Sequence, residues 1–172
     1  MTGTLHCTYC GRAFAPEQTG WPRTCPSCGR VSYRNPLPVV VVLLPVSDRG
    51  GLLVIRRSVA ADPGFGHFAL PGGYIDINDP TWQHAAAREL REETGIVLPP
   101  AAFSAFGVRS APNGTLLIFA LSAPVTSDAL RAFRATNETS EMAVITSPTE
   151  LAFSLHSEMA NSWFAGRRVG LD

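Results

Sequence analysis

Three glutamates lie close together in the stretch RELREETG, residues 88–95, of a chain that has only 14 acidic residues in all. They are Glu89, Glu92 and Glu93. On a helix, at about 100° per residue, their side chains fall within about one third of the circumference. Like charges three or four positions apart repel by about 0.2–0.5 kcal/mol per pair, so a purely structural helix would be more stable without one of them. A divalent cation removes that repulsion, because Mg²⁺ and Mn²⁺ prefer carboxylate oxygens.

The alternative interpretation of these glutamates is an acidic helix face that only water covers. Arg88 can pair with Glu92, although an arginine N-terminal to its glutamate is the weaker order. A helix of about fifteen residues is expected to carry the glutamates, with Asp79 as its N-cap and Pro80 at its first position. Gly95 is a natural left-handed stop for this helix.

A second group of reactive side chains is formed by two Cys-x-x-Cys pairs, each followed by glycine. They are Cys7 and Cys10 in CTYCG, and Cys25 and Cys28 in CPSCG. Four thiolates can close a tetrahedral zinc site, and glycine permits the tight turn that aims backbone N–H groups at them. Two disulfides are the alternative, but they require an oxidising compartment, and the first residues do not read as a signal peptide. We therefore expect a structural zinc ribbon in residues 1–35.

The composition is that of an ordinary globular protein and excludes several classes of function. The 172 residues are 45% hydrophobic and 16% charged, with a net charge of zero. The absence of a basic excess argues against a nucleic-acid partner. The most apolar run, residues 39–46, is far shorter than the about 20 residues of a membrane-spanning helix. We expect no membrane association and a cytoplasmic location.

Residues 36–172 alternate strand-like and helix-like segments without an internal repeat, which predicts one mixed α/β domain. The prolines of YRNPLP mark the linker before it. The first two strand-like runs, residues 39–46 and 52–57, should form a hairpin. Further strands are expected at residues 103–108, 115–121 and 141–146, and helical segments at residues 126–135 and 148–165.

The stretch from Gly73 to Ile96 resembles the Nudix box, the signature of a family of diphosphate hydrolases. The family pattern is G-x5-E-x7-R-E-U-x-E-E-x-G-U, where U is aliphatic, and RELREETGI matches its second half in full. The preceding LPGG is also similar to the family. Two departures stand out: Asp79 occupies the place of the first glutamate, and one additional residue precedes Arg88. The insertion should be absorbed around residues 76–80, with Asp79 acting only as a helix cap.

The resemblance implies an α/β/α sandwich with a mixed sheet, in which a loop–helix–loop holds Mg²⁺ or Mn²⁺. Carried over by position, Glu89, Glu92, Glu93 and the carbonyl of Gly73 would ligate the metal, while Arg88 would orient the carboxylates. The implied reaction is hydrolysis of a nucleoside diphosphate linked to another group, which gives a nucleoside monophosphate and a phosphorylated product.

Other residues are candidates for proton transfer and for substrate contacts. Members of the family often take the general base from outside the helix, and Glu138 and Glu141 both lie in the right region. The sequence does not choose between them, and each could be an ordinary surface glutamate. The candidate substrate contacts are basic or aromatic side chains, suited to phosphate or to a base: Arg57, Phe65, Tyr74 and Arg109.

A zinc ribbon directly before a Nudix domain resembles the bacterial NADH pyrophosphatases and their relatives. Their motif S-Q-P-W-P-F-P-x-S corresponds here to SAPNG, residues 110–114, which keeps the Ser-x-Pro frame without the aromatic residues. We therefore expect a small-molecule substrate such as ADP-ribose or a dinucleotide rather than NADH. The alternative function is a non-catalytic Nudix-fold module that senses nucleotides or is recruited to nucleic acid or protein through the ribbon. Relatives in the family are often dimers, so by analogy a homodimer is a further expectation.

Overall fold

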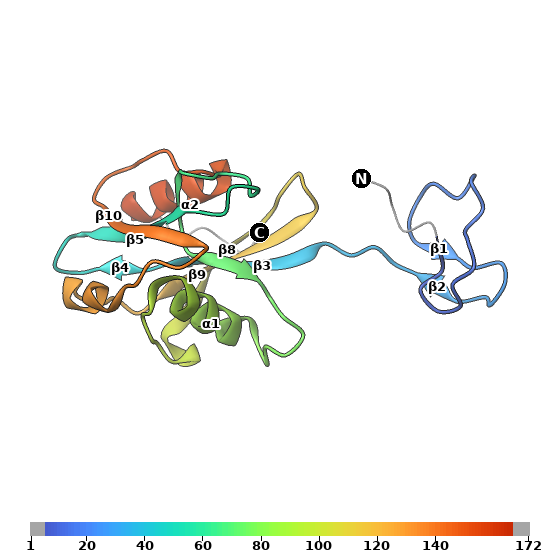
Figure 1. Cartoon of the computed structure of the whole chain (residues 1–172), viewed down its shortest axis with the longest axis horizontal. Coiled ribbons are helices and arrows are strands. Elements are labelled where there is room, and N and C mark those ends of the chain that lie inside the picture. Colours follow the sequence, from blue (N-terminus) through green and yellow to red (C-terminus); the bar gives the residue numbers. More distant parts are fainter. Residues whose placement is uncertain (1–5, 167–172) are drawn as a thin grey trace. The chain divides into compact units, whose positions relative to one another are not determined.

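The computed structural model of the chain describes residues 6–166 (Figure 1). The chain divides into two compact units, residues 1–36 and residues 37–172. The smaller unit contains the four cysteines, and the larger unit contains the glutamate-rich helix. Each unit is described by itself below.

The smaller unit consists of two tight turns and one short hairpin. Its strands β1 (Arg23–Thr24) and β2 (Val31–Ser32) are antiparallel. The N–H of Gly11 donates to the carbonyl of Cys7, and the N–H of Gly29 donates to that of Cys25, both at 2.9 Å. These glycines have φ angles of 72° and 70°, a conformation that other residues rarely adopt. The predicted tight turn at the glycine after each cysteine pair is therefore confirmed.

The first sheet of the larger unit has four strands in the order β7–β3–β9–β8. In that order, their bounds are Gly72–Tyr74, Leu37–Leu43, Thr115–Ser122 and Phe103–Ser110. Strand β3 is parallel to β9, whereas the other two pairings are antiparallel. The sheet is mixed, as the resemblance implied, and two of the predicted strands are confirmed as β8 and β9.

The second sheet is antiparallel and is built around β5. Strand β5 pairs with β10, β4 and β6; the bounds of these four are Gly51–Arg57, Thr139–Ile145, Pro45–Val46 and Phe68–Ala69. The predicted hairpin of residues 39–46 with residues 52–57 is only partly right, because only β4 pairs with β5. The apolar run changes sheets at Leu44. Since β3 is covered on both faces, its sequence is uniformly apolar and does not mark where the partner changes.

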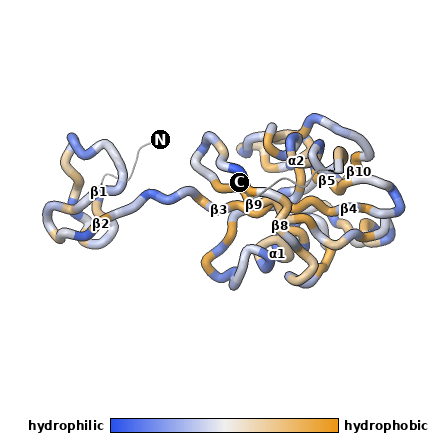
Figure 2. The backbone as a smooth tube through the Cα atoms, turned by 180° about the vertical axis from the view of Figure 1, so that it is seen from behind, coloured by the Kyte–Doolittle hydropathy of each residue, from blue (hydrophilic) through white to orange (hydrophobic). Residues whose placement is uncertain are grey.

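Two α-helices cover opposite faces of the sheets, as Figure 1 shows. Helix α1 (Trp82–Thr94) packs its Leu90 in one core cluster with Val40 and Val42 of β3. Helix α2 (Ser154–Phe164) packs with the alternate residues Val41 and Leu43. The central strands are the most hydrophobic part of the chain (Figure 2). This is the predicted α/β/α sandwich.

The remaining helical segments are shorter than the sequence predicted. The segment expected at residues 126–135 is a 3-10 helix over Ser127–Ala132, and α2 begins only at Ser154. A further 3-10 turn covers Pro100–Ala102. No helix in the described residues is both long enough and apolar enough to cross a membrane.

Helix α1 begins two residues later than predicted. Thr81 is its N-cap, with no side-chain capping hydrogen bond among the described residues, and Trp82 is its first residue. Asp79 and Pro80 therefore lie in the preceding loop, and the predicted helix cap at Asp79 is wrong. The helix then runs without interruption to Gly95, whose φ of 75° confirms the predicted left-handed stop. The additional residue of the box is thus absorbed ahead of the helix.

Helix α2 carries a buried histidine, His156, which is 7% exposed. Its ring lies between Phe119 and Phe153, with centroid distances of 6.0 and 4.9 Å. Its Nδ1 accepts a hydrogen bond from the N–H of Leu70 at 3.2 Å. Burial, together with the positive charge of Arg57, lowers the pKa of His156 to about 3.

The lowered pKa makes the stability of the fold depend on pH in a predictable way. In the unfolded chain His156 takes up a proton near pH 6.5, well before the folded protein does. Its contribution to stability is therefore complete above about pH 6.5 and is lost as the pH falls toward about 3. At pH 5 the loss should be about 2 kcal/mol, from 1.36 kcal/mol per pH unit. His156→Asn, which does not titrate, should lose correspondingly less between pH 7 and pH 5 in urea denaturation. Parallel losses in both proteins would contradict this assignment.

Candidate active site

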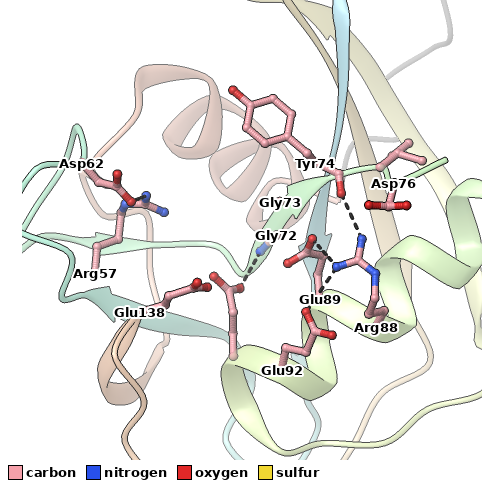
Figure 3. A pocket seen from close by; sticks show the side chains of 12 residues that line it. Arg57, Asp62, Gly72, Gly73, Tyr74, Asp76, Arg88, Glu89, Glu92 and Glu138 are labelled. Carbon is pink, nitrogen blue, oxygen red and sulfur yellow. Dashed lines mark hydrogen bonds and ion pairs between the residues drawn. The ribbon is translucent and has the colours of Figure 1, made fainter. Parts of the chain in front are cut away.

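A cavity of about 490 Å³ lies where α1 faces strand β7 (Figure 3). Its walls also include the end of β5 and the segment that leads into β10. In the described part of the chain, six carboxylates and two guanidinium groups line it: Asp62, Asp76, Glu89, Glu92, Glu93 and Glu138, and Arg57 and Arg88. Such an excess of carboxylates attracts cations and repels a free phosphate anion.

The cavity brings together eight of the residues that the sequence singled out: Arg57, Gly73, Tyr74, Arg88, Glu89, Glu92, Glu93 and Glu138. Three others, all in the described part of the chain, do not line it. Glu141 pairs with Arg56 across the second sheet, with Nε and Oε2 2.6 Å apart. Arg109 pairs with Glu158 of α2 at 3.0 Å. Phe65 lies in the loop before β6 with 52% of its surface exposed.

Arg88 connects the helix to the loop and to strand β7. Its Nη1 donates to Glu89 at 2.7 Å and to Glu92 at 3.2 Å. Its Nε and Nη2 donate to the two carboxylate oxygens of Asp79, at 3.1 and 2.8 Å, and Nη2 also donates to the carbonyl of Tyr74 at 3.0 Å. The hydrogen bonds from Arg88 hold the pKa of Asp79 below its usual value. Asp79 thus anchors Arg88 rather than capping the helix.

Glu93 is the most deeply placed of the three glutamates, with 5% of its surface exposed. Its Oε2 accepts a hydrogen bond from the N–H of Gly72 at 2.8 Å. Burial raises the pKa of Glu93 to about 8, and burial also raises the pKa of Glu89. A nearby cation would favour the ionised form of both groups, because it restores the stabilisation that burial removes.

Gly73 lies directly against the carboxylate of Glu89. A Cβ atom at this position would lie 2.6–2.7 Å from the carboxyl atoms of Glu89. Only glycine lets the carboxylate come this close to the β7 backbone. The chain segment before α1 and the helix itself therefore meet at a point where no side chain separates them.

The donor atoms at the cavity are of the chemical type that suits a hard divalent cation. Carboxylate and carbonyl oxygens are the ligands that Mg²⁺ and Mn²⁺ prefer, and Glu89, Glu92 and Glu93 all face the same cavity as the Gly73 backbone. The carboxylates are held separately, two by Arg88 and the third by Gly72. The site can therefore supply several oxygens from fixed positions.

The four cysteines of the smaller unit form a tighter group. Their sulfur atoms all lie within 4.8 Å of one another; the Cys7–Cys28 and Cys10–Cys25 separations are 3.8 and 3.7 Å. A tetrahedron with metal–sulfur distances of 2.3 Å has sulfur–sulfur edges of about 3.8 Å. The N–H of Tyr9, donating at 3.4 Å, is the main cause that lowers the pKa of Cys7 to about 6. These sulfurs could hold one metal ion.

Two aspartates of the site were not expected from the sequence, and a third was expected only as a helix cap. Asp62 and Asp76 line the cavity, and Asp79 holds Arg88. All three lie in loops outside the helix, so the helical periodicity that identified the glutamates does not apply to them. Asp79 stood at an acidic position of the box, whereas the only signal for Asp62 and Asp76 was their place in the loops before the helix.

Comparisons with known proteins agree with this geometry. Residues 36–163 match the family model of the NUDIX domain. The NAD-capped RNA hydrolase NudC of Salmonella heidelberg is 31% identical over 90 residues, which are 52% of this chain and 33% of that protein. The NudC of Shigella flexneri is 29% identical over 91 residues, again 33% of its length. The matched segment thus spans about a third of these curated relatives.

Solved structures show the same fold. A NUDIX hydrolase from Nitrosomonas europaea aligns over 98% of this chain and 94% of its own, with a TM-score of 0.70 and 23% identity. A bifunctional NMN adenylyltransferase/ADP ribose pyrophosphatase from Francisella tularensis, complexed with AMP and a manganese ion, aligns over 66% of this chain and 35% of its own. Its TM-score is 0.52, with 23% identity.

The contact at Gly73 generates a prediction about cation binding. In Gly73→Ala the new methyl group should push the flexible Glu89 carboxylate aside, while the fold remains intact. We expect the affinity for Mn²⁺ to fall by at least about tenfold, the scale of a disturbed ligand environment. Calorimetric titration and thermal unfolding would measure both effects. Gly20→Ala, where the added atom meets open space, is the control and should change neither. An unaltered Mn²⁺ affinity in Gly73→Ala would contradict the prediction.

Proposed function

This chain belongs to the Nudix family, and we propose that it is a divalent-metal-dependent hydrolase of nucleoside diphosphates linked to another group. The observation that carries the proposal is the acidic cavity, in which three α1 glutamates face the glycine backbone of β7. The products would be a nucleoside monophosphate and a phosphorylated second group. The domain that carries this activity would be residues 36–172.

Glu89, Glu92, Glu93 and the Gly73 carbonyl would hold Mg²⁺ or Mn²⁺. When bound, such an ion neutralises diphosphate charge and lowers the pKa of a coordinated water. Arg88 would position this set, because it is fixed by both oxygens of Asp79 and donates to the carboxylates of Glu89 and Glu92. The two arginines alone could not balance even the five carboxylates other than Glu93, so an anionic substrate requires added positive charge in this cavity.

Glu138 is the better candidate for the general base. It lines the cavity, on the side opposite Arg88 in Figure 3, and its negative charge contributes to the raised pKa of Glu93. Glu141 lies outside the cavity and is engaged by Arg56. A base must come within hydrogen-bond reach of the attacking water, directly or through one further water. We propose that the Glu138 carboxylate accepts the proton of the attacking water.

Arg57 and Tyr74 are the proposed substrate contacts. Arg57 is held in the cavity wall by Asp62 at 3.0 Å and by the carbonyl of Pro63 at 3.1 Å, and its guanidinium can meet phosphate oxygens. Among the described residues that line the cavity, Tyr74 supplies the one aromatic ring, and the residue is 58% exposed. A base or nicotinamide ring could stack on it.

The metal role of the helix generates the central test. Glu93→Gln should lower turnover by at least about 100-fold, because it removes a charged metal ligand. The metal-free variant should be no less stable than the wild type, since glutamine is neutral and its amide oxygen can still accept from Gly72. Glu138→Gln should also lose activity. Glu141→Gln, outside the cavity, is the matched control and should stay near wild type. Steady-state kinetics on a panel of diphosphate compounds would show this, and full activity of Glu93→Gln would rule out the assigned role.

We also propose that the four cysteines bind one zinc ion as a structural site within residues 1–35. The sulfur spacing supports zinc, and so does the small buried cluster of this unit, which consists of Cys7, Phe14 and Cys25. A core this small does not stabilise a fold without a cross-link or a metal. Elemental analysis should find one zinc per chain, and Cys25→Ser should abolish it. Two disulfides in a mass spectrum would overturn the proposal.

The substrate is proposed to be ADP-ribose or a related diphosphate rather than NADH. Residues 110–114 lack the aromatic side chains of the NADH pyrophosphatase motif, and one base–aromatic stack contributes about 1–3 kcal/mol. We expect kcat/KM for ADP-ribose to exceed that for NADH by about tenfold or more, at 1.4 kcal/mol per decade. The measurement compares ADP-ribose, NADH and an NAD-capped oligonucleotide with the same metal and pH. An NADH value ten times higher than that for ADP-ribose, by the same relation, would contradict the proposal.

A further inference from the structure

The short segment Leu70–Gly73 connects the two sheets and ends at the candidate metal site. Strand β6 pairs with β5 of the second sheet, whereas β7 pairs with β3 of the first. Between β6 and β7 the chain leaves the hydrogen-bond ladder of the second sheet before it enters that of the first. Backbone groups that neither ladder pairs at such a crossing need other partners, because a buried unpaired N–H is costly.

Three contacts from three different elements fix this segment. The N–H of Leu70 donates to Nδ1 of His156 at 3.2 Å. The carbonyl of Pro71 accepts from the N–H of Val42 in β3 at 2.8 Å. The N–H of Gly72 donates to Glu93 at 2.8 Å. Of these three partners, only His156 lies outside both strand β3 and helix α1.

The contact between Leu70 and His156 has no ready substitute. Leu70 is 2% exposed and His156 is 7% exposed, so water has little access to either group. Packing between Phe119 and Phe153 fixes the plane of the imidazole ring. A buried ring whose Nδ1 accepts a hydrogen bond is a neutral imidazole with its proton on Nε2.

The segment has little freedom to move without disturbing the site. A Cβ on Gly72 would lie 2.2 Å from the carbonyl oxygen of Val40, and one on Gly73 would lie 2.6 Å from the Glu89 carboxylate. Both glycines are therefore already in close contact with the residues around them. We therefore expect a displacement of Leu70 to disturb these two contacts.

We propose that His156 is a positioning residue of the active site, whose neutral imidazole holds Leu70 so that Gly72 and Gly73 meet Glu93 and Glu89 correctly. The inference rests on the proposed function for its catalytic consequence. Helix α2 would then do more than cover the sheet, since it would set the geometry of the cavity on the opposite face. His156 touches no substrate in this assignment and acts only through the backbone.

The experiment compares two substitutions of nearly equal shape. His156→Asn places an amide oxygen near the position of Nδ1 and can accept from Leu70, whereas His156→Leu cannot accept at all. We expect His156→Leu to lower kcat and the Mn²⁺ affinity by about 10- to 100-fold, the usual cost of losing such a supporting contact. His156→Asn should recover most of both. KM should change less than kcat, because the substrate contacts at Arg57 and Tyr74 remain.

A core substitution on the same helix separates positioning from stability. Met159→Ala removes a fully buried side chain of α2 and should lower the melting temperature without lowering kcat at a temperature where it is folded. If His156→Leu and His156→Asn lose kcat and Mn²⁺ affinity equally, or if Met159→Ala loses as much kcat, the positioning role is overturned.

Two measurements do not depend on turnover. Hydrogen exchange should show the Leu70 amide protected in wild type and in His156→Asn, and exchanging faster in His156→Leu. Nitrogen NMR of the wild type should show an unprotonated Nδ1 on His156, and a proton on Nδ1 would overturn the proposal even if His156→Leu did not fold. If the wild type hydrolysed no diphosphate but these results and the Mn²⁺ affinities held, the proposed function would fail and the positioning role would stand.

Discussion

The hydrogen bond from the N–H of Gly72 to the Glu93 carboxylate joins the two halves of the site, and the rest of the cavity is arranged around it. It fixes strand β7 to helix α1 at the point where the chain enters the first sheet. Gly73 then follows directly against Glu89. A Cβ atom would clash at both positions, with the Val40 carbonyl at Gly72 and with the Glu89 carboxylate at Gly73. The pair of glycines is therefore a steric requirement of the site and not a flexible hinge.

Concentrating carboxylates in this way has an electrostatic cost that the fold offsets only in part. Arg88 compensates Glu89 and Glu92, and Asp79 in turn holds Arg88. Glu93 has no arginine among these contacts, and burial raises its pKa to about 8. A carboxylate whose negative charge is poorly balanced within the protein is stabilised most by a bound cation. The weak compensation of Glu93 therefore favours cation binding over a closed network of ion pairs.

The sequence was most informative where one short pattern carries both the structure and the chemistry. The glutamates of α1, the stop at Gly95 and the two cysteine pairs all follow from local spacing, and the structure places them as predicted. The break at Leu44 could not be predicted, because a strand buried on both faces has no alternation to reveal its partner. His156 was also missed, since its role depends on an amide 86 positions away in the sequence.

Asp79, which departs from the family pattern, accepts hydrogen bonds from Arg88 with both carboxylate oxygens. Aspartate is one methylene shorter than the glutamate of the pattern, and the loop before the helix is one residue longer. The turn from Asp76 to Asp79, closed by the N–H of Asp79 on the Asp76 carbonyl at 3.0 Å, carries the shorter side chain toward the helix. Both its oxygens then reach Arg88. The turn thus brings the Asp79 carboxylate to Arg88, which in turn holds Glu89 and Glu92.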